Sequence, residues 1–134
     1  MLLNEVEAAE VGLPPTATGG YTGAEIVVVV GDRDVASITR TLFHELAHAL
    51  HERVVGADNF WGGDWTLSTR DWATALTMLR AATGRAPGYD VAQHMRDGRE
   101  FVAYLFSFVR LGYTPSERER ELYTRLGGPS LAAD

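Results

Sequence analysis

The stretch HELAHALH, residues 44–51, holds three of the four histidines of the chain, and the rest of the sequence is best interpreted outward from it. It lies in the middle of a segment predicted to be helical from Asp34, a suitable N-cap, to Val55, which a glycine follows. On a helix, positions i and i+4 share one face with Cβ atoms about 5–6 Å apart. The imidazoles of His44 and His48 are therefore expected to reach a single metal ion.

The first five residues of this stretch form the pattern H-E-x-x-H, in which Glu45 lies between the two histidines. A glutamate at this position can contact a water molecule at the metal without itself binding the ion, which is the arrangement of a general base. The apolar residues around the motif supply a side that packs into a core and leave the histidine face toward a cleft. The alternative is a solvated histidine and glutamate face on an amphipathic helix.

Two histidines do not complete a catalytic zinc site, in which three protein ligands leave one position for water. Glu100 is the best third candidate, because its helical neighbours Phe101 and Leu105 are apolar and a carboxylate near buried surface needs a partner. The alternative for Glu100 is a helix-start glutamate paired with Arg96. The competing ligands are His94, Asp97, Asp58, Asp64 and His51.

The composition narrows the class of protein. The chain has 134 residues, the size of one domain, and no cysteine, which excludes disulfides, thiolate ligands and cysteine nucleophiles. Its net charge is −6, and the twelve basic residues are nowhere gathered, so a nucleic-acid partner is disfavoured. No wholly apolar run, residues 26–30 included, is long enough to span a membrane. We expect a monomer without a membrane partner.

The N-terminal residues carry early acids and no basic region before an apolar one, unlike a secretory signal. The default expectation is a cytoplasmic protein, and the alternative is export as an effector by a route that needs no signal.

The remaining segments predict an α+β fold in which helices predominate and the sheet is small. The β-branched run Ile26 to Val30 is expected to be a strand buried on both faces. The other expected segments are a loop at 12–23, a loop at 57–67, a helix from a capping box at Ser68 to Gly84, a loop at 85–90, a helix from Val91 or His94 to Leu111, and a last helix capped by Thr114 and ending at Gly127. The expected divisions are an N-terminal extension at 1–23, a domain at 24–128 and a tail at 129–134.

The sequence H-E-L-A-H at 44–48, followed by E-F-V-A-Y-L-F at 100–106, resembles the gluzincin metalloproteases. Within them it is most similar to the catalytic domain of the anthrax-lethal-factor-like group, whose later helix reads E-F-x-A-x-x-F. The resemblance implies a small zincin-like domain with Zn²⁺ held by His44, His48 and Glu100 and with Glu45 as general base. It also implies that an upstream strand, here residues 26–30, holds substrate peptide in extended form.

That group also has a tyrosine shortly before the metal-binding glutamate, where it stabilises the oxyanion. Tyr89 is the only tyrosine between His48 and Glu100, and Tyr104 and His94 are its substitutes. Type III effector proteases with a similar H-E-L-x-H-A sequence, and the ImmA/IrrE regulators, show a second and a third resemblance. In the ImmA/IrrE regulators the third ligand usually follows much sooner.

Taken together, these features predict a zinc metalloendopeptidase that acts on a peptide or protein substrate, by analogy a toxin or effector protease. The alternatives are a zincin-like regulatory or binding module that does not cleave, and a metal-free helical interaction domain. Around the site, Trp61 and Trp65 are candidates for lining the substrate pocket, and the glycine pair at 62–63 makes their loop a candidate lid. Trp72 is expected to pack in the core, and His51 to be a partly exposed helical histidine.

Overall fold

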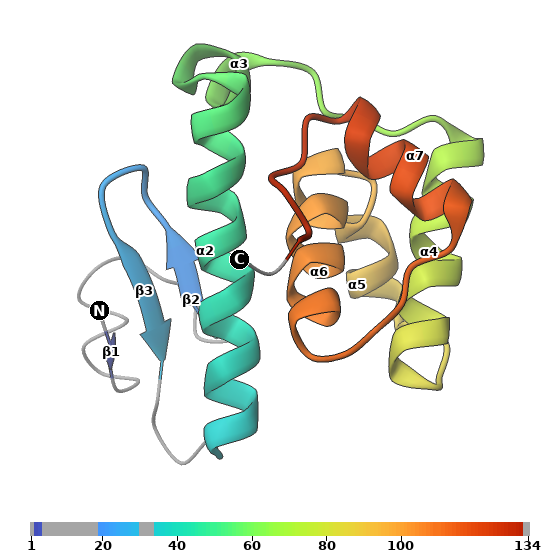
Figure 1. Ribbon diagram of the computed structural model, residues 1–134, viewed down its shortest axis with the longest axis horizontal. Helices are drawn as coiled ribbons and strands as arrows, with labels where there is room; N and C mark the ends of the chain where they lie inside the picture. The colour runs from blue at the N-terminus through green and yellow to red at the C-terminus, as the bar shows by residue number, and fades with distance from the viewer. Residues whose placement is uncertain (1, 4–18, 30–33, 133–134) are drawn as a thin grey trace.

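The computed structural model describes residues 2–3, 19–29 and 34–132. A long central helix, α2 (Val35–Val55), lies between a small sheet on one side and the remaining large helices on the other (Figure 1). The other elements are β1 (Leu2–Leu3), β2 (Gly19–Tyr21), β3 (Ile26–Val29), α3 (Ala57–Gly62), α4 (Thr69–Thr83), α5 (Tyr89–His94), α6 (Gly98–Arg110) and α7 (Glu117–Arg125). The expectation of an α+β, mostly helical fold is confirmed.

The sheet has the strand order β1-β3-β2, with β1 parallel and β2 antiparallel to β3. Val27 and Val28 are consecutive and both buried, so the expectation that this strand is covered on both faces is confirmed. The prediction of a loop at 12–23 is wrong at Gly19–Tyr21, which pairs with β3 as a strand. A Gly-Gly-Tyr segment has no alternation of polar and apolar residues that would predict a strand, so its extended conformation depends on the pairing. Residues 12–18 and Val30 lie outside the described residues.

Helix α2 has the bounds expected from the sequence. The Asp34 side chain accepts a hydrogen bond of 2.8 Å from the Ser37 amide, as an N-cap does. At the other end, Gly56 has a φ of 89°, a value that suits glycine, and its amide bonds to the Glu52 carbonyl. The caps therefore fix the length of the helix that carries the histidine motif.

The segment after α2 departs from the expected loop, because residues 57–62 form the short helix α3. Helix α4 begins and ends as expected. The Ser68 hydroxyl accepts from the Asp71 amide, and Gly84 ends the helix with a left-handed φ of 77°.

The single helix expected from Val91 or His94 to Leu111 is divided into α5 and α6. The division occurs because residues 96–98 bond to the segment before α4. The Leu67 amide donates to the Arg96 carbonyl, and the Gly98 amide donates to the Trp65 carbonyl. Asp97 then caps α6 by accepting from the Arg99 amide. The loop expected at 85–90 is correspondingly shorter, since α5 already begins at Tyr89.

The last helix begins two residues later than expected. Its N-cap is Ser116, not Thr114, and the glutamate that it contacts is Glu119. The Ser116 hydroxyl accepts from the Glu119 amide, as an N-cap does, and donates to the Glu119 carboxylate.

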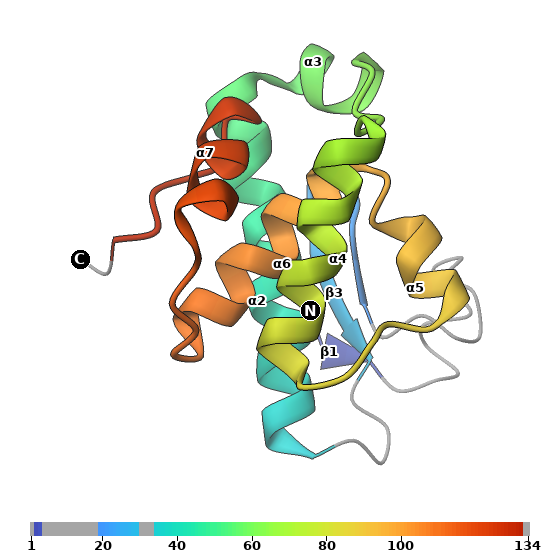
Figure 2. The same cartoon turned by 90° about the vertical axis from the view of Figure 1, so that its right-hand side faces the viewer.

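Helix α6 forms the centre of the hydrophobic core and packs against α2, α4 and α7 (Figure 2). Its buried residues include Phe101, Leu105 and Phe106. Contacts also cross residues 23 and 128, because β2 pairs with β3 and Tyr123 donates to the Pro129 carbonyl. The described helices include none that is long and apolar enough to cross a bilayer.

Candidate metal centre

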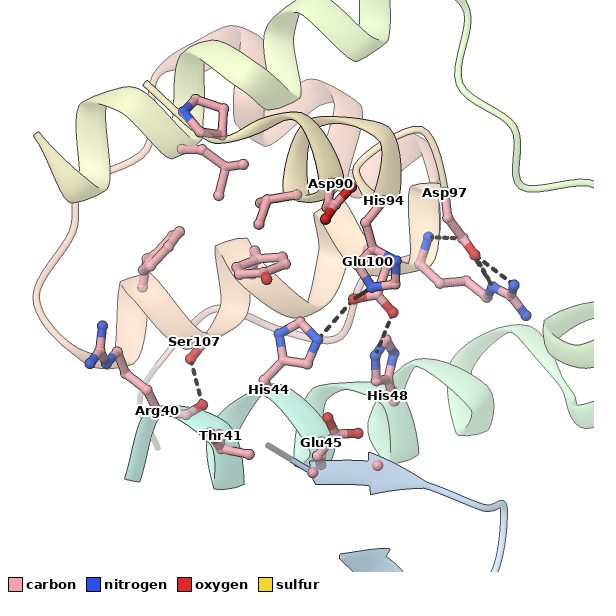
Figure 3. A pocket seen from close by; sticks show the side chains of 18 of the residues that line it. Arg40, Thr41, His44, Glu45, His48, Asp90, His94, Asp97, Glu100 and Ser107 are labelled. Atoms are coloured by element: carbon pink, nitrogen blue, oxygen red, sulfur yellow. Dashed lines mark hydrogen bonds and ion pairs between the residues drawn. The ribbon is translucent and has the colours of Figure 1, made fainter. Parts of the chain in front are cut away.

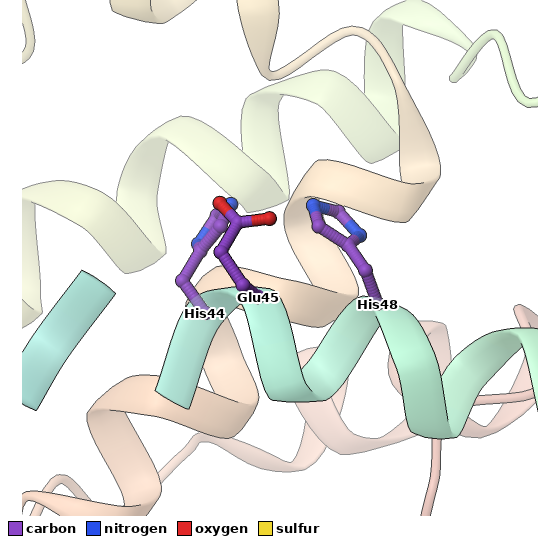
Figure 4. Close-up of side chains that lie close together, drawn as sticks. All are labelled: His44, Glu45 and His48. Atoms are coloured by element: carbon purple, nitrogen blue, oxygen red, sulfur yellow. The ribbon is translucent and has the colours of Figure 1, made fainter. Parts of the chain in front are cut away.

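Three side chains of the motif project from the same side of α2 (Figure 4). One ligand atom from each of His44, Glu45 and His48 lies within 4.8 Å of the others. Glu45 and His48 are only 7 % and 8 % exposed. The helical spacing therefore does what the sequence predicted: it gathers two imidazoles and a carboxylate at one place.

Glu100 reaches this place from α6, 52 residues after His48. Its carboxylate lies 2.9 Å from His44 Nε2 through Oε2 and 3.1 Å from His48 Nε2 through Oε1 (Figure 3). A tetrahedral ion with bonds of about 2.0–2.1 Å separates its ligand atoms by roughly 3.3 Å. The two observed separations are hydrogen-bond lengths and use different oxygens of the carboxylate. Glu100 thus lies within reach of an ion held by the histidine pair, while the residues whose ligand atoms already lie together are His44, Glu45 and His48.

The contact between α2 and α6 positions Glu100. Ala47 on α2 and Ala103 on α6 are both fully buried, and small side chains allow helices to approach closely. The Ser107 hydroxyl donates 3.1 Å to the Arg40 carbonyl and links the two helices near the other end. Glu100 lies in the first turn of α6, which directs its carboxylate toward the histidine pair.

The charges at the site are set by burial and by neighbouring groups. Burial by itself raises the pKa of the Glu100 carboxyl, but hydrogen bonds from His44, His48 and His94 hold it well below its usual range. Burial also raises the pKa of Glu45, against the opposing effect of the two motif histidines. Glu100 is therefore the anion of the site, while Glu45 is the carboxylate more ready to accept a proton.

The third histidine near Glu100 is His94, the last residue of α5. Its Nε2 lies 3.1 Å from Glu100 Oε2, the same oxygen that His44 contacts. The His94 side chain is 60 % exposed, in contrast to the motif histidines. The sequence had suggested it as a competing ligand, and the structure places it beside the expected ligands.

The two candidate tyrosines have different places. The ring of Tyr104, one turn after Glu100 on α6, meets the His44 ring edge to face with centroids 4.6 Å apart. Tyr89 is 77 % exposed, and the residues that line the cleft do not include it. The expectation that Tyr89 acts at the site is thus not supported by the geometry, because α5 begins there and turns the side chain to solvent. Tyr104 and His94 remain the candidates for oxyanion stabilisation.

The other competing ligands are engaged elsewhere. Asp97 forms an ion pair of 2.6 Å with Arg99 and caps α6. Asp58 and Asp64 are exposed and do not line the cleft. His51 is fully buried, and its Nε2 lies 2.8 Å from the Leu126 carbonyl oxygen, so the expectation of a partly exposed histidine is wrong.

A cleft of about 1280 Å³ surrounds the candidate ligands. One wall is β2, whose three residues all line the cleft, and the opposite wall includes α5 and the loop before it. Gly19 is essential to this wall, because a Cβ there would lie 2.6 Å from both Thr41 Cγ2 and the Val27 carbonyl oxygen and 3.4 Å from Glu45 Cγ. Glycine therefore allows the strand to lie against the motif helix. Sequence reasoning missed this role, and its only signal was a pair of glycines.

The tryptophans of the expected lid are held in place. The Trp65 indole N–H contacts the carbonyls of Asn59 and Phe60, both at 3.1 Å. Trp61 lines the cleft, stacks on Tyr21 and stays half exposed. Trp72 packs against the core and donates to the Ala92 carbonyl, as expected of a core tryptophan.

The His48 ring is fixed mainly by ring contacts. In the described part of the chain its Nδ1 is buried without a hydrogen-bond partner. The ring instead meets His44 and Phe60 edge to face, at centroid distances of 4.9 and 6.0 Å. Packing, and not an outer hydrogen bond, directs its Nε2 toward Glu100.

The chain was compared with family models, curated proteins and solved structures. No family model matches the chain, and neither the curated proteins nor the solved structures give a significant match.

Proposed function

We propose that this chain is a zinc-dependent peptidase in which His44, His48 and Glu100 hold the metal and Glu45 is the general base. The observation that carries the proposal is the position of the Glu100 carboxylate, 2.9 and 3.1 Å from the Nε2 atoms of the two motif histidines. Two nitrogens and one carboxylate oxygen are the ligand types and number found in catalytic zinc sites.

When bound, zinc supplies Lewis acidity, which polarises a substrate carbonyl and makes a water molecule more acidic. Glu45 lies beside the histidine pair and is not needed as a ligand once Glu100 is present. Its carboxylate can accept a proton from the attacking water and pass it to the leaving amine. A purely structural metal site has no need of such an acid.

The free edge for a peptide is β2, not the strand at 26–30 that the resemblance suggested. Among the described strands, β3 lies between β1 and β2, so β2 is at the edge of the sheet and lines the cleft. An extended peptide can add to such an edge through main-chain hydrogen bonds. Its scissile bond would then lie beside Glu45, whose side chain packs against Gly19.

A second candidate function is a metal-binding regulatory module that does not cleave. The observation that favours it is His94, a third imidazole beside Glu100. Closed sites with four protein ligands are typical of structural zinc, whereas catalytic sites keep one position open. For the peptidase, the resemblance of the motif to those of effector proteases is the basis on which we propose a toxin or effector role.

The test is cleavage by the purified, zinc-loaded protein of a mixture of unfolded proteins, with new N-termini identified by mass spectrometry. We expect cleavage that a chelator abolishes and added zinc restores. Glu45→Gln should keep its zinc and cleave at least about 100-fold more slowly, because the general base is lost. Glu117→Gln, the same change at an exposed site on α7, is the matched control and should cleave normally.

Equal cleavage by Glu45→Gln would reject its role as base. Zinc bound at one equivalent without cleavage of any substrate would favour the regulatory module.

A further inference from the structure

The imidazole of His94 has the same relation to Glu100 as the two motif histidines. All three use Nε2, and the three distances to a carboxylate oxygen are 2.9, 3.1 and 3.1 Å. His94 and His44 converge on the same atom, Oε2.

We propose that His94 is a fourth protein ligand, so that the resting site is filled by three histidines and one glutamate. This inference rests on the proposed metal site and concerns how that site is regulated. A set of four protein ligands is the closed arrangement of zinc. His94 therefore occupies the position that a water molecule needs for hydrolysis.

The side chain of His94 is suited to leaving the site, because it is 60 % exposed. Helix α5 has six residues, none of them buried, and His94 is its last residue. The helix is held to the core by the hydrogen bond of 2.7 Å from the Trp72 indole to the Ala92 carbonyl and by the fully buried Met95, which follows His94. His44, His48 and Glu100 lie instead on α2 and α6, two long helices that pack against one another in the core. When a peptide enters between β2 and α5, His94 is the ligand whose exposed side chain can rotate out of the site while Met95 stays in the core.

The direct test is to count the histidines whose Nε2 binds zinc. Two-bond ¹H–¹⁵N correlation spectra of the ¹⁵N-labelled full chain, recorded before and after one equivalent of Zn²⁺, report each ring nitrogen through non-exchanging carbon-bound protons. We expect the Nε2 resonances of His44, His48 and His94 to move to the metal-bound position. His51, whose Nε2 faces the Leu126 carbonyl, is an internal control and should not move.

Three outcomes are distinguishable. Three metal-bound nitrogens support the proposal. Two, with the Nε2 of His94 in its N–H form, overturn it and make His94 a hydrogen-bond donor to Glu100, while the proposed three-ligand site stands. No metal-bound nitrogen overturns the metal site and the proposed function together.

Variants provide a second readout. His94→Ala should weaken zinc binding, measured by competition with a chelator, by at least about tenfold. Gln93→Ala, an exposed neighbour on the same helix, should leave it within about twofold, the margin for an uninvolved surface residue. At saturating zinc, His94→Ala should cleave peptide faster than the unchanged protein, because the fourth position is then free. Slower cleavage would contradict the closing role and assign His94 to stabilising the oxyanion.

Discussion

His48 and His51 lie three residues apart on α2, and both are buried, yet they belong to different regions of the molecule. His48 faces the cleft and the Glu100 carboxylate, together with two other imidazoles. His51 faces the seam between α2 and the end of α7, where its Nε2 lies 2.8 Å from the Leu126 carbonyl oxygen. A carbonyl needs only a hydrogen-bond donor, whereas a carboxylate among several imidazoles has the composition of a metal site. Burial by itself therefore does not indicate a functional histidine. The chemical group that the ring nitrogen contacts does.

The largest expected effect separates these two histidines by metal affinity. His48→Ala should lower zinc affinity by at least about 100-fold, since a direct ligand matters more than the outer contacts that are worth 10–100-fold. His51→Ala should leave zinc affinity within about tenfold, below the effect of losing such an outer contact. Chelator competition on the two variants measures the difference. Equal losses would place both histidines in one functional unit and remove the distinction between cleft and seam.

The same pair should rank in the opposite order for stability. His51→Ala leaves the partly buried Leu126 carbonyl without its histidine donor and opens a cavity beside Phe60 and Trp65. The expected loss is roughly 2–4 kcal/mol in the free energy of unfolding. Urea unfolding of the metal-free proteins tests this, and a larger loss for His48→Ala would show that the cleft histidine is the structural one.

A substitution at Gly19 changes the wall of the cleft and leaves the proposed metal ligands unchanged. Gly19→Ala places a Cβ 2.6 Å from a backbone carbonyl, so β2 must shift away from α2. We expect a loss of roughly 1–3 kcal/mol in stability and reduced peptide cleavage with zinc affinity retained. Gly62→Ala is the control, because its Cβ meets no atom within 4 Å. Unchanged stability and cleavage in Gly19→Ala would show that the strand does not form the substrate wall.

The smallest effect concerns an ion pair far from the cleft. Asp71 on α4 and Arg125 on α7 are 2.8 Å apart, and the hydrogen bond from Arg125 lowers the pKa of Asp71 below its ordinary value of 3.8. A carboxyl with a lowered folded-state pKa adds stability above about pH 4 and loses it as the pH falls through the folded value. Because Arg125 is largely exposed, Asp71→Asn should cost only about 0.2–1 kcal/mol at pH 7.

Unfolding of Asp71→Asn and of the unchanged protein at pH 7 and pH 2.5 measures this contribution. The difference between the two proteins should shrink at the lower pH. A difference that grows on acidification would contradict the sign of the pKa shift.

The parts of the molecule that could be predicted from sequence are those governed by local signals. Helical spacing placed His44 and His48 together. Side-chain caps fixed the starts of α2 and α4, and Gly56 fixed the end of α2. Glu100 was identifiable because an acid within an apolar helix needs a partner.

The remainder depended on contacts between distant segments. β2 exists because Gly19–Tyr21 pairs with β3, and the helix expected after residue 91 divides because residues 96–98 bond to residues 65–67. The burial of His51 depends on a carbonyl 75 residues away, which no local pattern indicates.

The most direct measurement is calorimetric titration of the metal-free protein with Zn²⁺, beside Glu100→Gln. The structure predicts one equivalent bound by the unchanged protein and a loss of at least about 100-fold in affinity for Glu100→Gln, since the carboxylate that lies 2.9 and 3.1 Å from the two motif histidines becomes an amide. No binding, or equal affinity in the two proteins, would contradict the assignment of His44, His48 and Glu100 as a metal centre.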